Sequence, residues 1–165
     1  MAELTNLESK LGEVVGLAMA AQEATQKVAK LAKDDGDDNL VGELEKMRNE
    51  AKETEERGTE VAGSFEGKKT AILDEAREVK QKAQQMMKTY LDEASDALDG
   101  FEFLTMAEAG EVGHWEILKT LNERAGNSEV KQLAEWAIPI QQRHLETVRS
   151  TSLELAAEED PNETS

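Results

Sequence analysis

The chain contains no cysteine, and this absence excludes several kinds of chemistry at once. Without cysteine there is no disulfide, no iron–sulfur ligand and no thiolate nucleophile. Prolines are also few, with 2 in 165 residues, and aromatic residues make up only 4% of the chain. The core must therefore be built from Leu, Val, Ile, Ala and Met. Together with many Glu and Lys residues, this composition favours packed helices over sheets.

Basic residues are scarce beside acidic ones. The chain has 19 Lys and Arg against 36 Asp and Glu, a formal net charge of −17. Nucleic-acid binding needs a basic face that displaces counterions, so this balance argues against nucleic acid, and it argues equally against anionic membrane surfaces. No apolar run is long enough to span a bilayer, and the first ten residues lack the apolar stretch of a signal peptide. We therefore expect a cytoplasmic protein.

Hydrophobic spacing predicts helices along almost the whole chain. Apolar residues recur every three or four positions, which is the spacing of one helix face. Thr5 with Glu8 can form a capping box at the first helix, and Gly36, Gly126 and Asn127 are typical of helix ends. The predicted helices cover about 3–33, 39–64, 70–98, 101–125 and 128–157.

These helices predict an all-α fold, an antiparallel four-helix bundle with an additional long crossover helix. We expect a single domain over residues 1–157 and a flexible acidic tail over residues 158–165. Gly100 interrupts the apolar spacing, so we expect a kink or a short turn near Asp99. Pro139 lies inside the last predicted helix, where it removes one backbone donor.

Both histidines of the chain follow a polar residue by three positions, in Glu111-x-x-His114 and Gln141-x-x-His144. Residues three apart share one face of a helix. The tight connection near residue 126 makes the last two helices antiparallel neighbours, which places Glu111 opposite Gln141. We therefore predict that these four residues form a buried polar network.

The network has two interpretations. Paired Glu-x-x-His motifs on facing helices supply ligands to metal ions in some bundles, and here Glu111, His114 and His144 are the candidate metal ligands. A centre of two iron or manganese ions needs about four carboxylates, however, whereas Gln141 is neutral and no histidine precedes His114. The favoured interpretation is therefore hydrogen bonding within the core, with no catalytic residue, no resident metal and no cofactor.

The chain resembles the YciF-type bacterial stress-protein family, a branch of the ferritin-like superfamily. The likeness extends over about residues 10–155, and its motifs agree in order and approximate spacing. They are Glu53–Arg57, Gly67–Lys69, Ile72–Ala76, Val112–Ile117 and Gln141–Arg143. The resemblance implies a ferritin-like bundle with a helical crossover.

The same comparison implies that metal ligands have been lost. Arg57 stands where the family pattern has histidine, and Gly113 stands where it has glutamate. Gln141 and Gln142 replace carboxylates, and the first helix offers alanine near the expected glutamate. We predict that Arg57 joins the polar network and pairs with Glu111, so that a fixed positive charge replaces the metal.

The expected function is that of a non-catalytic bundle with a degenerate metal site, acting as a stress-related structural or interaction protein and forming a homodimer. The alternative is a ferritin-like oxidase or peroxide-handling protein that binds two metal ions. A pocket for a small ligand, beside Gly58 and Gly113, is a third possibility. Trp115 and Trp136 are expected to be partly buried packing residues rather than an association surface.

Overall fold

The computed structural model describes residues 2–164, so Met1 and Ser165, the outer ends of the predicted bundle and tail, lie outside the described residues. Within this range the fold is all-α, as predicted, and it contains no strand. The elements are α1 (Asn6–Asp34), α2 (Asp38–Gly63), α3 (Lys69–Tyr90), α4 (Ala97–Ala125) and α5 (Ser128–Glu158).

Three helix ends form where local sequence signals predict them. Thr5 and Glu8 make a reciprocal capping box at the start of α1, with the Thr5 amide donating to the Glu8 carboxylate at 2.8 Å. Gly126 ends α4 with a φ of 68°, a left-handed conformation that favours glycine. The Asn127 side chain then accepts hydrogen bonds from the first backbone amides of α5. These ends depend on short-range contacts, which is why the sequence predicts them well.

The boundary between α3 and α4 differs from the prediction. The third helix ends at Tyr90 rather than near residue 98, and α4 begins after a capping box formed by Asp96 and Asp99. Gly100 is no break, because it lies inside α4 against Val28 of α1. A Cβ added at Gly100 would meet a Val28 methyl at 2.9 Å. This glycine serves close helix packing instead of a turn.

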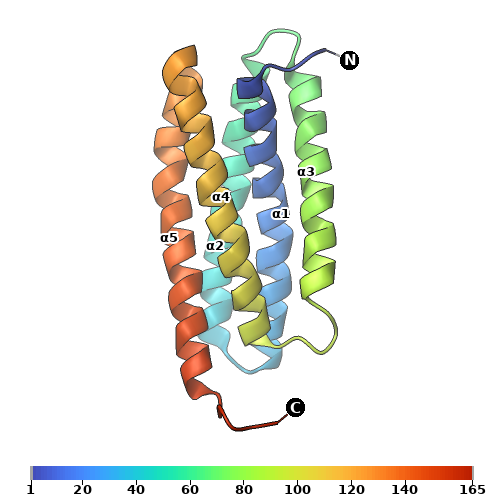
Figure 1. Ribbon diagram of the computed structural model, residues 1–165, viewed down its shortest axis with the longest axis vertical. Helices are drawn as coiled ribbons and strands as arrows, with labels where there is room; N and C mark the ends of the chain where they lie inside the picture. The colour runs from blue at the N-terminus through green and yellow to red at the C-terminus, as the bar shows by residue number, and fades with distance from the viewer. Residues whose placement is uncertain (1, 165) are drawn as a thin grey trace.

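Short connections make consecutive helices run in opposite directions (Figure 1). Helices α1, α2, α4 and α5 form a bundle in which α1 packs on α2 and α4, and α5 packs on the same two helices. Helix α3 lies outside this bundle, along α1 and, to a smaller extent, α2. It returns the chain along the bundle axis, so that α2 and α4 run in the same direction (Figure 1).

The interior consists of two hydrophobic clusters with a polar layer between them. On α4, for example, Phe101 and Leu104 belong to one cluster and Trp115 and Leu118 to the other. The buried residues between them on the same helix are Glu108 and Glu111. The same change from apolar to polar and back occurs along α5, where Gln141 and His144 lie between Ala137 and Val148.

Trp115 sets the rotation of α4 in the bundle. Its side chain is fully buried, although the indole N–H finds no hydrogen-bond acceptor within residues 2–164. A missing hydrogen bond costs about 1–3 kcal/mol, whereas burying roughly 200 Å² of aromatic surface contributes about 5 kcal/mol. Burial of the ring therefore outweighs the cost, and the buried face of α4 follows Trp115.

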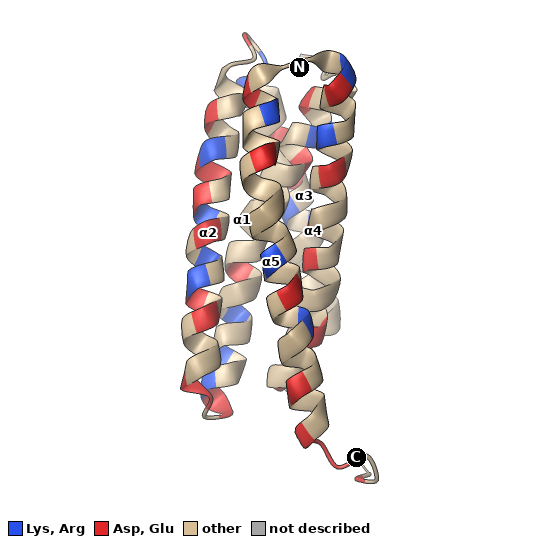
Figure 2. Cartoon of the chain, turned by 90° about the vertical axis from the view of Figure 1, so that its left-hand side faces the viewer, with Lys and Arg blue, Asp and Glu red and all other residues tan. Residues whose placement is uncertain are grey.

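Charged residues of both signs occupy the outer faces of the helices and are interspersed along α2 (Figure 2). The Glu- and Lys-rich run of α2 is therefore a solvated surface. No helix within residues 2–164 combines the length and the apolarity needed to cross a bilayer.

Glycines let α3 lie close to α1. A Cβ added at Gly16 would come within 2.3 Å of the Ala76 carbonyl oxygen, and one at Gly12 within 2.7 Å of the Ile72 carbonyl oxygen. Because the obstructing atoms belong to the α3 backbone, the helix would have to move away to admit a larger side chain.

We predict that Gly16→Ala lowers the free energy of unfolding by about 1–3 kcal/mol, because overpacking outweighs the gain in helix propensity. Gly113→Ala is the matched control, since a Cβ there meets nothing within 4 Å. The control should be stabilising by up to about 1 kcal/mol. Urea denaturation of both variants measures the difference, and equal effects would contradict the close α1–α3 contact.

Candidate functional site

The polar layer is the candidate site. Its buried members come from all four helices of the bundle, and each side chain is at most 3% exposed: Thr25, Thr54, Glu108, Glu111, Gln141 and His144. The carboxylate of Glu50, which is 19% exposed, closes the layer on the α2 side. Buried polar groups need hydrogen-bond partners, so the contacts among these residues decide what the layer can do.

Gln141 links the two buried carboxyl groups. With its amide nitrogen turned toward α4, it donates to Glu108 Oε2 at 3.0 Å and to Glu111 Oε2 at 3.1 Å. In this orientation each carboxyl group accepts one of the two amide hydrogens of Gln141. The contact confirms the predicted pairing of Glu111 with Gln141 across the α4–α5 seam.

Burial changes the protonation of both glutamates. Removal from water raises the pKa of Glu108 to about 8. It also raises the pKa of Glu111 well above its usual value, and the neighbouring charge of Glu108 adds to this effect. The burial cost falls on the ionised form, so both carboxyl groups hold their protons at neutral pH.

A second group of contacts fixes His144 and Glu50. His144 Nε2 lies 3.2 Å from Glu50 Oε1, and its Nδ1 lies 3.9 Å from Glu108 Oε2. Arg143 donates to both oxygens of Glu50, at 2.9 and 2.5 Å. The hydrogen bonds from Arg143 lower the pKa of Glu50 to about 2, while burial lowers the pKa of His144. Glu50 is therefore ionised beside a guanidinium, and the His144 ring is neutral.

The two threonines of the layer bond to their own helices. Thr25 donates to the Ala21 carbonyl oxygen at 2.7 Å, and Thr54 donates to the Glu50 carbonyl oxygen at 2.8 Å. Around Thr25, the buried residues of α1 are all apolar: Ala18, Ala21, Ala24 and Val28. Helix α1 therefore adds no charged group to the layer.

His114 does not belong to the buried network, contrary to the prediction. Its side chain is 39% exposed, and its Nδ1 lies 3.2 Å from both Lys10 Nζ and Glu13 Oε2 of α1. The adjacent residue, Trp115, occupies the interior in its place. The predicted metal candidates Glu111, His114 and His144 are thus not brought together as one set.

Arg57 is also outside the network, and its predicted pairing with Glu111 is wrong. It bonds to Glu53 at 3.0 Å, and its guanidinium carbon lies 4.3 Å from the centre of the Trp136 ring. Its side chain is 48% exposed, because Thr54 and Gly58 hold the inward positions on this part of α2. Arg143, on α5, supplies the guanidinium that pairs with a carboxylate of the layer.

Glu108 and Glu50 are members of the site that the sequence interpretation did not include. Glu108 belongs to a set of positions on α4 that recur every three or four residues and face the interior: Leu104, Glu108, Glu111 and Trp115. The burial of Trp115 places this set, rather than the neighbouring face with His114, inside the bundle. The sequence shows this spacing, and the large apolar side chain of Trp115 is the feature that could have indicated which face is buried. Glu50 sits in a Glu-rich run, and only its contact with α5 distinguishes it.

Within residues 2–164, no three His, Asp or Glu side chains are grouped in a way that could hold a metal ion. No protein-family model, curated protein or solved structure gives a significant match to the chain.

We predict that stability falls as the pH rises from about 5 to 9. The folded-state pKa of Glu108 is raised from 4.5 to about 8, so its contribution is fully present below pH 4.5 and is lost as the pH passes 8. Glu111 acts in the same direction. Each pKa unit corresponds to roughly 1.4 kcal/mol, which makes the total loss several kcal/mol.

Chemical denaturation across this pH range measures the effect. Glu111→Gln removes one of the two proton-binding groups, so its pH dependence should be about half as steep. Glu116→Gln, an exposed position on the same helix, should keep the slope of the parent protein. A parent protein whose free energy of unfolding is constant between these pH values would contradict the assignment of protonated carboxyl groups.

Proposed function

We propose that the protein is a non-catalytic bundle of the ferritin-like type, in which a hydrogen-bonded network stands in place of a metal centre. One observation carries this proposal: the Gln141 amide lies between Glu108 and Glu111 and donates to both. A metal ion needs ionised carboxylates as its ligands. The amide instead satisfies carboxyl groups that hold protons.

The charge of the layer supports the same conclusion. Glu108 and Glu111 are neutral, His144 is neutral, and the ionised Glu50 is paired with Arg143. The charges of the polar layer therefore sum to zero without a bound cation. The predicted replacement of a metal by a fixed positive charge is kept in this proposal, but the charge belongs to Arg143 and its partner is Glu50.

The residues do not fit a centre of two metal ions. Such a centre takes a carboxylate from each of two helices and a Glu-x-x-His pair from each of the other two. Here α1 offers alanine and threonine, α2 offers Ala51 and Thr54 at its buried positions, and the α5 motif has Gln141 in place of glutamate. Besides Glu108, Glu111 and His144, the layer has the carboxylate of Glu50 on α2, which is already paired with Arg143.

With no catalytic arrangement in the layer, we propose a structural or interaction role. The resemblance to bacterial stress proteins adds the expectation of a stress-related role in the cytoplasm. Ile117 and Leu153 are large apolar residues that are 47% and 60% exposed, and they are candidates for the contact in a homodimer.

The alternative, an iron- or manganese-binding oxidase or peroxide-handling protein, has one observation in its favour. Both ring nitrogens of His144 face carboxyl oxygens, those of Glu50 at 3.2 Å and Glu108 at 3.9 Å.

Metal analysis separates the two functions. Protein purified without a histidine tag should contain well under one iron or manganese ion per chain, and added Mn²⁺ should leave the melting temperature unchanged. About two ions per chain, the content of a carboxylate-bridged centre, would overturn the proposed network.

A substitution tests the network directly. Gln141→Glu removes the amide donors and adds a third buried carboxyl group, so it should lower the free energy of unfolding by about 2–3 kcal/mol at neutral pH. Gln142→Glu is the matched control, because Gln142 is exposed, and its effect should stay within about 0.5 kcal/mol. Equal effects of the two substitutions, measured by urea denaturation, would show that the amide does not hold the layer together.

A further inference from the structure

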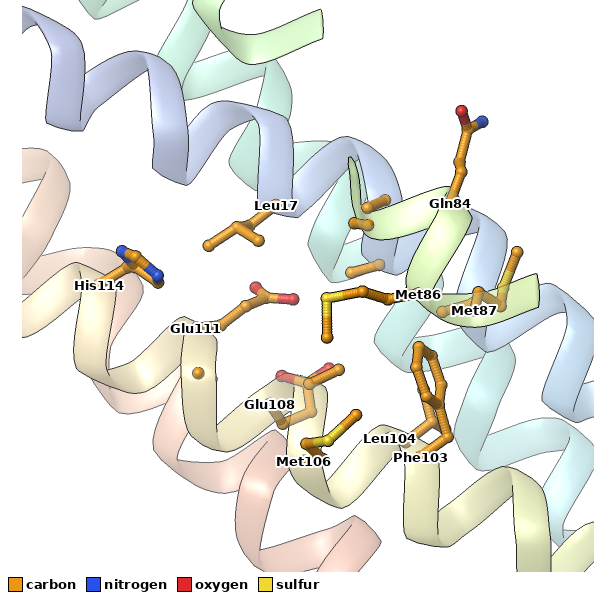
Figure 3. A pocket seen from close by; sticks show the side chains of 16 residues that line it. Leu17, Gln84, Met86, Met87, Phe103, Leu104, Met106, Glu108, Glu111 and His114 are labelled. Atoms are coloured by element: carbon orange, nitrogen blue, oxygen red, sulfur yellow. The ribbon is translucent and has the colours of Figure 1, made fainter. Parts of the chain in front are cut away.

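A cavity of about 200 Å³ lies between α1, α3 and α4, next to the polar layer. Alanines of α1 and α3 and a glycine of α4 make room for it, while Leu17, Phe103 and Leu104 give it apolar walls. Figure 3 shows that its side chains converge from three helices. A dry cavity of about 150 Å³ accepts benzene in another protein, so this space suits a ligand slightly larger than one aromatic ring.

The polar groups of the cavity wall are concentrated on α4. Glu108 and Glu111 both line it, and Figure 3 shows the Glu111 carboxyl group in the space between Leu17 and Met86. Gln141 approaches only one oxygen of each glutamate, Oε2. Within residues 2–164, no side chain bonds to the other oxygen of Glu111, which is left for a ligand.

Methionine side chains surround the mouth of the cavity. Met86 of α3 and Met106 of α4 line it and are 48% and 40% exposed, and Met87 lies beside them. Methionine side chains are unbranched and adapt to ligands of different shape. Outside, the net charge of −17 attracts cations toward any opening.

We propose that this cavity binds a small organic cation, with an apolar body in the alanine- and methionine-lined space and one protonated amine donating to Glu111 and Glu108. A buried carboxylate is stabilised by an opposite charge at close range. A cation favours ionisation of the carboxyl group that it contacts, whereas an anion of similar size opposes it and a neutral ligand leaves the carboxyl group protonated. This inference goes beyond the proposed structural role, and it holds whether or not the protein forms a dimer.

Three probes of similar size and different charge test the proposal. Benzylamine, benzyl alcohol and benzoate share one ring and one short polar group. In calorimetric titrations at physiological salt, benzylamine should bind saturably and at least tenfold more tightly than benzyl alcohol, while benzoate should not bind. No saturable benzylamine binding up to about 10 mM, or equal affinity for the alcohol, would overturn the proposal.

Substitutions locate the bound amine. Glu111→Gln keeps the shape of the side chain and should weaken benzylamine binding at least tenfold, while the exposed Glu116→Gln on the same helix should bind as the parent does. Ala83→Leu fills the cavity from α3 and should abolish binding of both benzylamine and benzyl alcohol. Circular dichroism confirms that each variant is folded. Unchanged affinity in folded Glu111→Gln would place the amine elsewhere and reject the site.

Proton release gives a further readout. The carboxyl groups hold protons in the free protein, so binding of an ammonium should release one, and the affinity should increase as the pH is raised. The other titratable groups that face the pair are His144 of α5, which contacts Glu50 of α2, and His114 at the edge of the cavity. The α1 and α3 residues that line the cavity are not titratable.

The heat of benzylamine binding should accordingly vary with the ionisation enthalpy of the buffer. Amine held only by surface carboxylates releases no proton, so a heat of binding that is independent of the buffer would reject the buried site. This measurement is separate from metal content, and a metal-free protein that fails to bind benzylamine would overturn this inference alone.

Discussion

The burial of Glu108 and Glu111 in the middle of the bundle is the constraint on which the rest of the interior depends. An ionised carboxylate in that position would cost several kcal/mol, so the groups are kept neutral and need donors and acceptors around them. Gln141 meets this need from α5. The hydrophobic core is consequently divided in two, with packing above and below and a specific hydrogen-bonded layer between.

The two glutamates have different surroundings on their two sides. Toward α5 they meet an amide and the neutral His144 ring, and toward α1 and α3 they meet a cavity lined by alanine and methionine. Helix α3 matters for both sides, because it covers the cavity and is held close to α1 through Gly12 and Gly16. A helix that connects two members of the bundle thus also shapes the space beside the polar layer.

Two residues that seemed chemically suited to the layer, Arg57 and His114, lie outside it, and two that drew no attention, Glu50 and Glu108, lie within it. The reason is the rotation of each helix about its own axis, which decides the side chains that face the interior. Shifting a set of helix positions by one residue gives a neighbouring face of the helix. Both sets can show apolar residues every three or four positions, so the spacing in the sequence does not say which face is buried. The indole of Trp115 buries more apolar area than the His114 ring, and packing selected the face that contains the tryptophan.

The sequence by itself determined the elements whose causes are local: an all-α chain, the capping box at Thr5, the turn at Gly126 and Asn127, and through that turn the pairing of Glu111 with Gln141. Tertiary structure alone decided where α3 ends, that Gly100 packs rather than turns, and that Arg143 supplies the balancing charge for Glu50. It also decided that a cavity opens onto the buried carboxyl groups. Caps and turns depend on residues within a few positions of one another, whereas helix rotation, close approach and cavities depend on surfaces contributed by helices far apart in the chain.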